Sequence, residues 1–589
     1  MPPPGKTHRP EKAGRFCDQK LANKVTATSL PKILPGETRR TMTHPNALEA
    51  TRATYIPKHP ASLHEHAAAL RSDPPPAASE DVRERFPHTF DLPTVTFSDK
   101  NAQGESRPIR SGVILSGGPA PGGHNVMAGL FDGLKRIHPA SSLFGFLNGP
   151  AGLLKDSGRE IDAATVDRYR NTGGFDLIGS GRTKLESEAD YRKALETARA
   201  RELTGLVVIG GDDSNTNACM LAEFARKEGS PLQVLGVPKT IDGDMKGGSI
   251  ETSFGFDTAC KVYAELIGNI NRDALSVRKY WHFIKLMGRS ASHIALECAL
   301  QTRPTITLIS EEVAARSLRL HGIVDHIAGI IAARSANNQN FGTVLIPEGL
   351  VEFIPEMRQL IAELNEVLVT GWQEFSALET LPHKREFVTG CLSPESSGLY
   401  RNLPREVANQ LILDRDPHGN VQVARIDTQR LFIELVEHRL KEMQSAGSYG
   451  GGFSPQHHYL GYEGRCAAPS NFDADYTYNL GFTAALLLRE GLTGYVATVR
   501  HLTRPTWEWL PGGIPLSRMM NLERRHGNIV PVIRKALVEL DGPAFKVLEA
   551  NRDQWASETH FAFPGPIQYF GPPEICDRTT ITLQLEANA

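Results

Sequence analysis

The chain has 589 residues, more than a single hydrophobic core usually organises, so we expect two or three packed domains. With 40% hydrophobic and 22% charged residues it is too apolar for a wholly disordered chain. The 65 Lys and Arg nearly balance the 67 Asp and Glu, giving a formal charge of -2, and no run approaches the roughly 18 apolar residues of a membrane helix. We therefore expect no nucleic acid and no membrane among the main partners.

Residues 1–90 are predicted to be an N-terminal extension. Residues 1–44 carry nine basic and three acidic side chains, clustered prolines and no apolar periodicity. The prolines oppose the amphipathic helix of a transit peptide, so we expect a disordered tail, or a start placed too early with Met42 as the alternative first residue. One short extended run, Thr94 to Phe97, lies in a segment that resembles an arm around a core built elsewhere.

From Ile109 onward, short apolar runs alternate with helix-period segments. The runs IRSGVILS, LTGLVVIG and LQVLGV each lead into a glycine-containing segment that we expect to begin a helix, the last being PKTIDGDMKGG. Continuous apolar strands alternating with helices predict a parallel sheet covered on both faces. We assign residues 91–256 to this first α/β domain and expect part of 465–560 to complete it.

A second α/β domain is expected over residues 257–464. HFIKLM, PTITLIS and GTVLIPEG repeat the strand pattern, and helical stretches at 351–375 and 427–444 indicate a helical insertion over about 351–450. The last segment, 465–589, is expected to pack back on both domains. The fold class is therefore α/β, with two Rossmann-like parallel-sheet domains.

The segment Gly117 to Asn125, GGPAPGGHN, follows the first strand directly. Glycines let backbone N–H groups approach an anion, and the next helix presents its positive end. The spacing is neither that of a dinucleotide-binding loop nor that of a P-loop. Taken alone, the loop fits a phosphate cradle and a ligand-free turn equally well.

The second strand ends in Gly210-Gly211-Asp212-Asp213-Ser214-Asn215. Adjacent carboxylates on a glycine-containing turn are suited to Mg²⁺, which combines one or two carboxylates with substrate phosphates. Asp213, Ser214 and Asn215 are also common helix N-caps, and taken alone the motif favours that interpretation.

The third strand end reads Pro238-Lys239-Thr240-Ile241-Asp242-Gly243-Asp244. Phosphoryl transfer needs a cation, a carboxylate to take the acceptor proton and a metal-linked acid, and this segment offers all three types. A polar surface loop is the alternative. Because ligands bind at the carboxyl ends of parallel strands, the three consecutive ends together predict a phosphoryl-transfer site.

These motifs, with MGRSASHIALECAL and PEG in the same order, resemble the phosphofructokinases over about residues 90–560. GYEGR at Gly461 to Arg465 and the chain length resemble the long, pyrophosphate-dependent members of that family. The resemblance implies the phosphofructokinase fold and reversible transfer of a phosphoryl group from diphosphate to fructose 6-phosphate, giving fructose 1,6-bisphosphate and phosphate, with Mg²⁺ as cofactor.

On the donor side, the resemblance implies that Gly117, Gly118, Arg182 and Lys239 bind diphosphate. It implies that Asp212 is the Mg²⁺-linked aspartate.

On the acceptor side, the resemblance implies that Asp242 deprotonates the sugar 1-hydroxyl. It also implies a fructose 6-phosphate site made of Thr240, Ile241, Asp242, Met287, Gly288, Arg289, Glu348, Tyr462, Glu463, Gly464 and Arg465. Arg289 is suited to clamp the phosphate, with capping of the next helix as its alternative. Lys279 and Tyr280 resemble a pair that reaches the sugar site of a neighbouring subunit, which implies a homodimer or higher oligomer. They are otherwise ordinary surface residues.

The choice of donor rests on Asp213 and Lys239, which we group with Asp242 as catalytic. ATP-dependent relatives have glycine at both positions. At an effective dielectric constant near 20, like charges about 4 Å apart repel by roughly 4 kcal/mol, so a carboxylate at 213 disfavours the α-phosphate of ATP. The Lys239 ammonium is suited to a compact, highly charged leaving group. Both residues favour diphosphate.

Three alternatives stay open: an ATP-dependent phosphofructokinase, a non-catalytic regulatory subunit of such an enzyme, and a lipid or NAD kinase with a GGD-type turn. The last does not explain MGR, PEG and YEGR. His124 and His293 have no spaced partner and are expected to be a loop or packed helix histidine. The seven scattered cysteines predict buried thiols in a reducing compartment and hence a cytoplasmic protein.

Overall fold

The computed structural model describes residues 49, 52–64, 69–73, 80–98, 107–414, 421–525, 528–567 and 577–588. Every helix and strand named below belongs to one compact unit, residues 50–589. The expected disorder of residues 1–44 and the expected burial of Cys17 and Cys576 lie outside the described residues.

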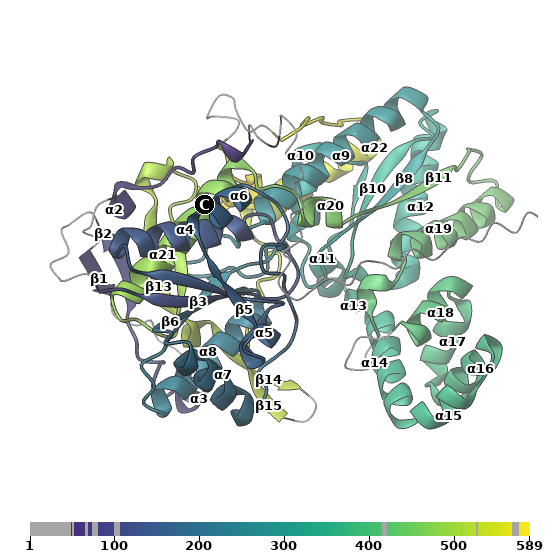
Figure 1. The fold of residues 1–589 in the computed structure, drawn as a ribbon. Helices are drawn as coiled ribbons and strands as arrows, with labels where there is room; N and C mark the ends of the chain where they lie inside the picture. The colour runs from purple at the N-terminus through teal and green to yellow at the C-terminus, as the bar shows by residue number, and fades with distance from the viewer. Residues whose placement is uncertain are drawn as a thin grey trace, which may run out of the picture. The chain divides into compact units, whose positions relative to one another are not determined.

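Among the described residues, the larger sheet has nine strands in the order β1-β2-β13-β12-β7-β6-β3-β4-β5 (Figure 1). Its centre, from β12 to β4, is parallel, and both edges are antiparallel. In sheet order the bounds are Ala69–Asp73, Thr94–Ser98, Leu510–Pro515, Tyr495–Arg500, Gln233–Pro238, Gly205–Gly210, Arg110–Leu115, Ser142–Phe146 and Gly158–Ile161. The predicted strand at Thr94 to Phe97 is confirmed as β2, and it pairs with β13.

Helices cover both faces of this sheet. Successive side chains of its central strands point to opposite faces and are apolar on both, so each face needs a layer of helices to bury it. Val113 and Leu115 of β3 belong to the hydrophobic cluster that includes α4 and α21, whereas Ile114 belongs to the cluster that includes α7 and α8. These helices are Gly123–Ile137 (α4), Asn471–Arg489 (α21), Glu188–Ala200 (α7) and Asp212–Lys227 (α8). Shorter helices nearby are Ala61–His64, Glu80–Arg85, Pro150–Leu154 and Ala163–Tyr169 (α2, α3, α5 and α6).

The second sheet, within the described residues, has four parallel strands in the order β11-β8-β10-β9. Their bounds are Pro455–Leu460, Trp281–Leu286, Gly342–Pro347 and Ile306–Thr307. One face shares the hydrophobic cluster of the first sheet through α9 (Phe256–Val277) and α10 (His293–Thr302). Because this single cluster reaches both sheets, their strand ends keep a fixed relation across the space between them.

The other face of the second sheet belongs to a separate hydrophobic cluster. That cluster contains residues of α12 (Leu320–Ala336), of α19 (Thr428–Ser445) and of the insertion helices α14 to α18, whose bounds are Pro355–Thr370, Trp372–Ala377, Leu381–Cys391, Pro394–Asn402 and Arg405–Leu413. Figure 1 shows α14 to α18 gathered beside one another. The helices between β9 and β11 also include α11 (Ser310–Ala315) and α13 (Leu350–Phe353).

The end of the chain returns to both sheets. A hairpin of β14 (Met520–Arg525) and β15 (Asn528–Ile533) packs against α8. Residues 533–538, which we call the strap, start at the end of the hairpin. The chain then continues into α22 (Pro543–Ser557) and α24 (Ile581–Ala587). Ala536 N donates to Asp244 O at 2.7 Å, beside the first sheet, and Val538 N donates to the Glu311 carboxylate at 3.0 Å, beside the second.

Two local expectations are wrong, and a third is confirmed over two residues only. The segment after β7 forms no helix before Phe256, because Gly243, Gly247 and Gly248 adopt positive φ there and interrupt helical backbone. PTITLIS contributes only the two-residue strand β9, since helix α11 already begins at Ser310. Cys391 and Cys466 are exposed, whereas Cys219, Cys260 and Cys298 are buried as expected.

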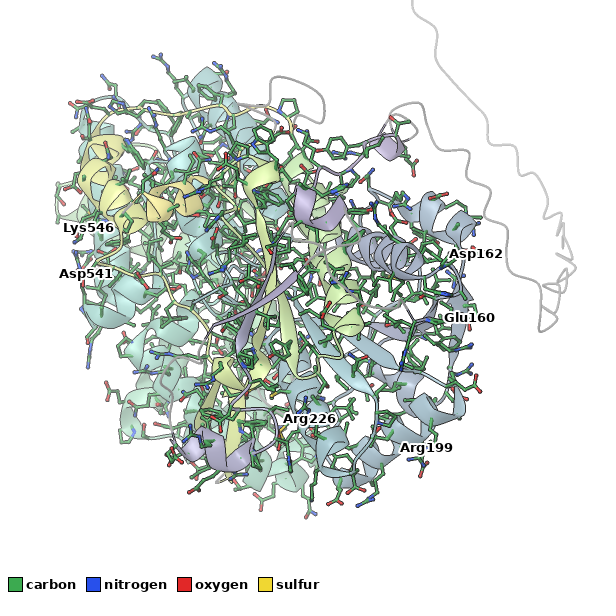
Figure 2. All side chains as sticks on the ribbon, turned by 90° about the vertical axis from the view of Figure 1, so that its left-hand side faces the viewer. Glu160, Asp162, Arg199, Arg226, Asp541 and Lys546 are labelled. Carbon is green, nitrogen blue, oxygen red and sulfur yellow. The ribbon has the colours of Figure 1, made fainter. Side chains whose placement is uncertain are left out.

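Charged side chains such as Glu160, Arg199 and Lys546 lie exposed on the surface (Figure 2). Within the part of the chain that the structure describes, no helix has the length and apolar character needed to cross a membrane.

Candidate functional site

Three neighbouring parallel strands, β3, β6 and β7, bring the glycine-rich loop and both acidic loops to one edge of the larger sheet. Leu115 is in register with Ile209, and Gly210 with Pro238, so the segments that follow start side by side. Ser214 Oγ donates to Ser116 Oγ at 2.8 Å and joins two of these strand ends. The predicted convergence of the three motifs is confirmed.

The loop at Gly117 and Gly118 is shaped around two cations. A Cβ on Gly118 would stand 1.5 Å from a guanidinium nitrogen of Arg465, and one on Gly117 would stand 3.2 Å from Lys239 Nζ. Arg465 Nε donates to Pro119 O at 3.2 Å. Because glycine leaves this space empty, a guanidinium and an ammonium both reach the turn, which creates a positive environment for an anion.

Asp212 and Asp213 occupy the first turn of α8, whose N-cap is Gly211 without a side-chain capping bond. The helix-cap interpretation of GDDSN is therefore wrong, and both carboxylates are free of a capping role. Asp213 is exposed and lies 3.6 Å from Lys184 Nζ. Lys184 was not identified from the sequence, although Arg182, two residues before it, was.

Lys239 is a buried lysine surrounded by charges of both signs. Burial, helped by repulsion from Arg465, lowers its pKa to about 8, although attraction from Asp242 and Asp212 opposes the shift. Arg182 is exposed. Its guanidinium also repels the Lys239 ammonium, so Arg182 lies near the same charged groups as Lys239. Three basic side chains thus converge beside the glycine-rich loop.

Asp242 and Asp244 follow β7 and share their environment with Asp212. Burial and repulsion from Asp242 raise the pKa of Asp244 to about 7, with a further contribution from Asp212. Among the described residues no ready-made group of three His, Cys, Asp or Glu ligands is present. One or two carboxylates facing bound phosphate nevertheless match the preference of Mg²⁺, so the residues present fit that ion.

Lys535 completes this cluster, and no motif in the sequence pointed to it. Its Nζ lies 3.4 Å from Asp212 Oδ2 and 3.9 Å from Asp244 Oδ2. It donates a hydrogen bond of 2.6 Å to Ser290 Oγ, beside Arg289. Burial lowers the pKa of Lys535, but attraction from Asp212 and Asp244 outweighs burial and leaves the pKa raised.

The second sheet contributes the facing side of the site from the ends of β8, β10 and β11. Gly288 N donates to Glu348 Oε2 at 3.3 Å, and Tyr459 OH donates to Glu348 Oε1 at 3.0 Å. Met287 N donates to Leu460 O at 3.0 Å. Burial raises the pKa of Glu348, and repulsion from Asp242 raises it further. Glu348 and Asp242, which follow strands of different sheets, therefore lie in one electrostatic environment.

Arg465 links the two sheets directly. It lies in the short helix α20 (Tyr462–Arg465) after β11, contacts Met287 Sδ at 3.8 Å and reaches Pro119 of the first sheet's loop. Tyr462 and Glu463 of this helix are exposed, whereas Gly464 is buried against Tyr263. Arg289 is exposed and free of a capping role, because Ser292 is the N-cap of α10.

Thr240 and Ile241 hold the Asp242 loop in shape. Thr240 Oγ1 accepts a hydrogen bond from Asp242 N at 3.1 Å, Thr240 O accepts one from Ser253 Oγ at 2.8 Å, and Ile241 is buried in the core. These contacts fix the backbone from which the Asp242 carboxylate projects.

Lys279 and Tyr280 lie apart from this site. They precede β8, while Met287 follows it, and the six-residue strand separates them by roughly 20 Å. Lys279 Nζ lies 5.5 Å from the centroid of the Tyr280 ring, and Lys279 is exposed. Within one chain the structure therefore does not bring this pair to the other predicted residues.

The two candidate histidines are packed, as expected. Burial lowers the pKa of His124 to about 4, and it also lowers that of His293. His124 Nδ1 lies 2.7 Å from Thr172 Oγ1, and His293 Nε2 lies 3.0 Å from Ala536 O. Both rings serve packing and hydrogen bonding.

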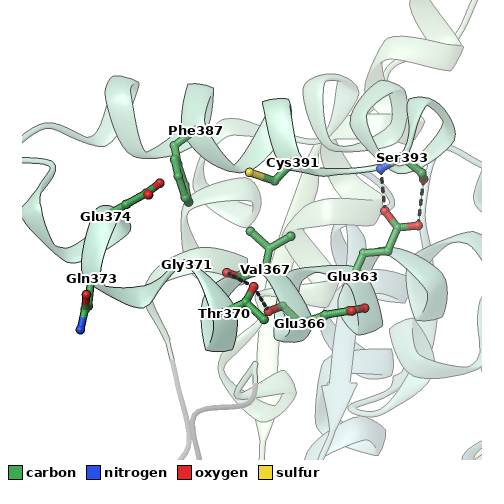
Figure 3. Close-up of a pocket in the computed structure, with 10 residues that line it drawn as sticks. All are labelled: Glu363, Glu366, Val367, Thr370, Gly371, Gln373, Glu374, Phe387, Cys391 and Ser393. Carbon is green, nitrogen blue, oxygen red and sulfur yellow. Dashed lines mark hydrogen bonds between the residues drawn. The ribbon is translucent and has the colours of Figure 1, made fainter.

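A cavity of about 610 Å³ lies elsewhere, in the helical insertion (Figure 3). Its lining includes Glu363, Glu366 and Glu374, and Glu363 already accepts hydrogen bonds from Ser393 N and Oγ. Carboxylates repel a phosphorylated ligand, so this cavity is unsuited to the chemistry of the strand ends.

Comparison with known proteins agrees with this geometry. Residues 110–380 match the phosphofructokinase family. The chain is 55% identical to the pyrophosphate–fructose 6-phosphate 1-phosphotransferase of Treponema pallidum, covering 92% of this chain and 97% of the relative. It is 53% identical to the enzyme of the same name from Porphyromonas gingivalis, covering 92% and 99%.

Among solved structures, the pyrophosphate-dependent phosphofructokinase of Marinobacter aquaeolei aligns with a TM-score of 0.50 at 16% identity, covering 77% of this chain and 93% of that one. A likeness at this identity concerns the fold alone, and it confirms the predicted fold.

Proposed function

The chain belongs to the phosphofructokinase family, and from this premise we propose that it catalyses reversible transfer of a phosphoryl group from inorganic diphosphate to the 1-hydroxyl of fructose 6-phosphate. The relatives that cover nearly the whole chain are named for this reaction. The alternative of a lipid or NAD kinase has no support in these relatives.

The observation that carries the choice of donor is the pair Asp213 and Lys239 at adjacent strand ends. Asp213 places an exposed carboxylate on the first turn of α8, where it opposes the additional phosphate of a nucleotide. Lys239 places a buried ammonium beside the Gly117 turn, where a compact anion would lie. Diphosphate fits both constraints better than ATP.

We assign the acceptor chemistry to Asp242. Its carboxylate takes the proton of the sugar 1-hydroxyl as that oxygen attacks the terminal phosphorus of diphosphate, and the phosphoanhydride bond breaks to release phosphate. Lys239 neutralises charge on the leaving phosphate. Arg182 is assigned to the diphosphate through its place beside Lys239.

The sugar phosphate is assigned to the facing sheet. Arg289 and Arg465 provide guanidinium groups suited to its phosphate, and Glu348 is placed to accept a sugar hydroxyl. Lesser contacts are assigned to Thr240, Ile241, Met287, Gly288, Tyr462, Glu463 and Gly464.

Enzymes of this family are phosphotransferases that typically need a divalent metal ion, and we infer Mg²⁺ here. Asp212, with Asp244 nearby, would hold it. When bound, the ion neutralises charge on the phosphate oxygens.

We further infer an oligomer in which Lys279 and Tyr280 complete the sugar site of a neighbouring subunit, since the pair lies far from the site of its own chain. A cytoplasmic location stays a prediction that rests on the cysteine pattern.

A coupled assay that compares diphosphate with ATP on the purified chain tests this function. We expect turnover with diphosphate, fructose 6-phosphate and Mg²⁺. Turnover with ATP alone would identify an ATP-dependent enzyme, and no turnover with either donor would favour the non-catalytic subunit.

The double variant Asp213→Gly, Lys239→Gly tests the donor argument itself. Removing the repelling carboxylate and the buried ammonium should raise the KM for diphosphate and allow some use of ATP. A matched control is Asp541→Gly, an exposed carboxylate at the surface. Unchanged diphosphate kinetics in the double variant would contradict the argument.

A further inference from the structure

Lys535 is a cation that reaches the carboxylates of Asp212 and Asp244 from the C-terminal strap. It lies almost 300 residues after Asp244 in the chain. Its ammonium contacts Ser290 Oγ at 2.6 Å, Asp212 Oδ2 at 3.4 Å and Asp244 Oδ2 at 3.9 Å. Ser290 follows β8 of the second sheet, whereas the two aspartates follow β6 and β7 of the first. The ammonium therefore stands where the donor side and the sugar side of the site meet.

The strap holds this lysine in place through its backbone. On one side of Lys535, Ile533 N donates to Thr216 Oγ1 of α8 at 3.3 Å. On the other side, Ala536 N donates to Asp244 O at 2.7 Å, and Ala536 O lies 3.0 Å from His293 Nε2. An exposed lysine on a free loop would lose conformational entropy on binding a ligand, but here much of that ordering is already built into the fold.

Val538 extends this anchoring to the second sheet. Its N–H donates to Glu311 Oε1 at 3.0 Å, and the same oxygen accepts a hydrogen bond from Ser292 N at 3.0 Å. Glu311 is buried, so the strap is fixed at both ends of the Lys535 position. Elements beside both sheets therefore hold the backbone on either side of Lys535.

The partners of Lys535 are the groups that a metal–diphosphate complex would engage. Asp212 and Asp244 attract a divalent cation, and a cation bound there competes with the ammonium for the same oxygens. An ammonium displaced from the carboxylates needs another anion close by, and the oxygens of diphosphate meet that need.

We propose that Lys535 is a phosphate-binding residue of the donor site, which pairs with Asp212 and Asp244 in the free protein and with an oxygen of diphosphate in the complex. This inference rests on the proposed function, because it takes diphosphate as the donor. Through this one side chain the strap contacts the Asp212 and Asp244 loops of the first sheet and the Ser290 loop of the second.

Binding measurements on Lys535→Met test the exchange of partners, since methionine keeps most of the length of the unbranched side chain and removes its charge. Calorimetry with inorganic diphosphate in the presence of Mg²⁺ should show affinity about 10- to 100-fold weaker than in the wild type, the range expected for one charge-assisted hydrogen bond. Titration with Mn²⁺ alone, followed by electron paramagnetic resonance, should show tighter binding, because the carboxylates have lost their competing cation. Lys535→Arg should retain most of the diphosphate affinity.

The exposed neighbour Arg534 provides the matched control, and Arg534→Ala should leave both affinities unchanged. Unchanged diphosphate affinity in Lys535→Met would overturn the inference. Weaker binding of both diphosphate and Mn²⁺ would also overturn it, since that result indicates a structural role. Should the methionine variant not fold, Lys535→Gln carries the same expectations.

Turnover by the wild type separates the two proposals. If the wild type uses diphosphate while Lys535→Met binds it normally, only the inference about Lys535 fails. If the wild type does not use diphosphate, the proposed function fails.

Discussion

Asp242 lies at the centre of the charged groups in the proposed site. It influences the pKa of Lys239 on one side, of Asp244 in its own loop and of Glu348 on the facing sheet. Its backbone N–H is held by Thr240 Oγ1 at 3.1 Å. A single carboxylate is therefore positioned toward both the donor and the acceptor side.

Replacing Asp242 with alanine should lower kcat by about 10³-fold, because general-base catalysis acts in the transition state. Binding of fructose 6-phosphate should be largely retained. Steady-state kinetics with diphosphate and equilibrium binding of the sugar phosphate measure the two effects, with Asp541→Ala as an exposed control. Normal turnover in Asp242→Ala would remove this residue from the mechanism.

The buried ammonium of Lys239 predicts a pH dependence. Its pKa is lowered to about 8, so the group is charged below that pH and becomes neutral above it. The neutral amine attracts diphosphate less strongly, and kcat/KM for diphosphate should fall as the pH rises through about 8. A pH profile of kcat/KM measures this, because that ratio reports the free enzyme. A profile that is flat between pH 7 and 9 would contradict the assignment.

At the scale of elements, a buried carboxylate connects two long helices. Asp473, in the first turn of α21, accepts hydrogen bonds from Gly255 N at 3.0 Å and Thr258 N at 2.9 Å, at the start of α9. Thr258 Oγ1 donates to the same carboxylate at 2.5 Å. Since α9 follows the Asp242 loop, this cap also fixes where that loop ends.

Asp473→Ala should reduce the free energy of unfolding by about 3 kcal/mol, because it leaves buried donors without an acceptor. Asp162→Ala is the matched control: Asp162 caps α6 by accepting from Thr165 N at 2.7 Å, but it is exposed, so water replaces the lost bond. Urea denaturation of both variants measures the difference. Equal losses would show that burial does not govern the cost.

At the scale of the whole molecule, the separation of Lys279 and Tyr280 from the remaining site residues predicts cooperation between subunits. Asp242→Ala and Lys279→Ala should each be weakly active alone. Mixed dimers should regain activity, because one of their two shared sites then combines an intact Asp242 with an intact Lys279.

Co-expression of the two variants with different affinity tags, followed by purification of the mixed species, measures this recovery. Mixing two Asp242→Ala chains in the same way is the control and should recover nothing. A mixed dimer as inactive as its parents would contradict a shared site.

The strands and the residue types at their ends could be predicted from the amino-acid sequence. The apolar runs at β3, β6 and β7 are local signals, and parallel strands place their carboxyl ends at one edge, so the meeting of Gly117, Asp212 and Asp242 could be predicted. The segment after β7 was predicted less well, because its glycines permit conformations that composition does not specify.

Which side chains meet between these strand ends could not be predicted, because they come from segments that approach one another only in the folded protein. Arg465 against Gly118 depends on how closely the two sheets approach, and Lys535 beside Asp212 depends on a strap whose hydrogen bonds join residues hundreds of positions apart. No local pattern encodes such a contact, because its energy arises only when both sheets and the chain end have packed. The motifs therefore indicated the chemistry, while the packing of distant segments decided which charges share the site.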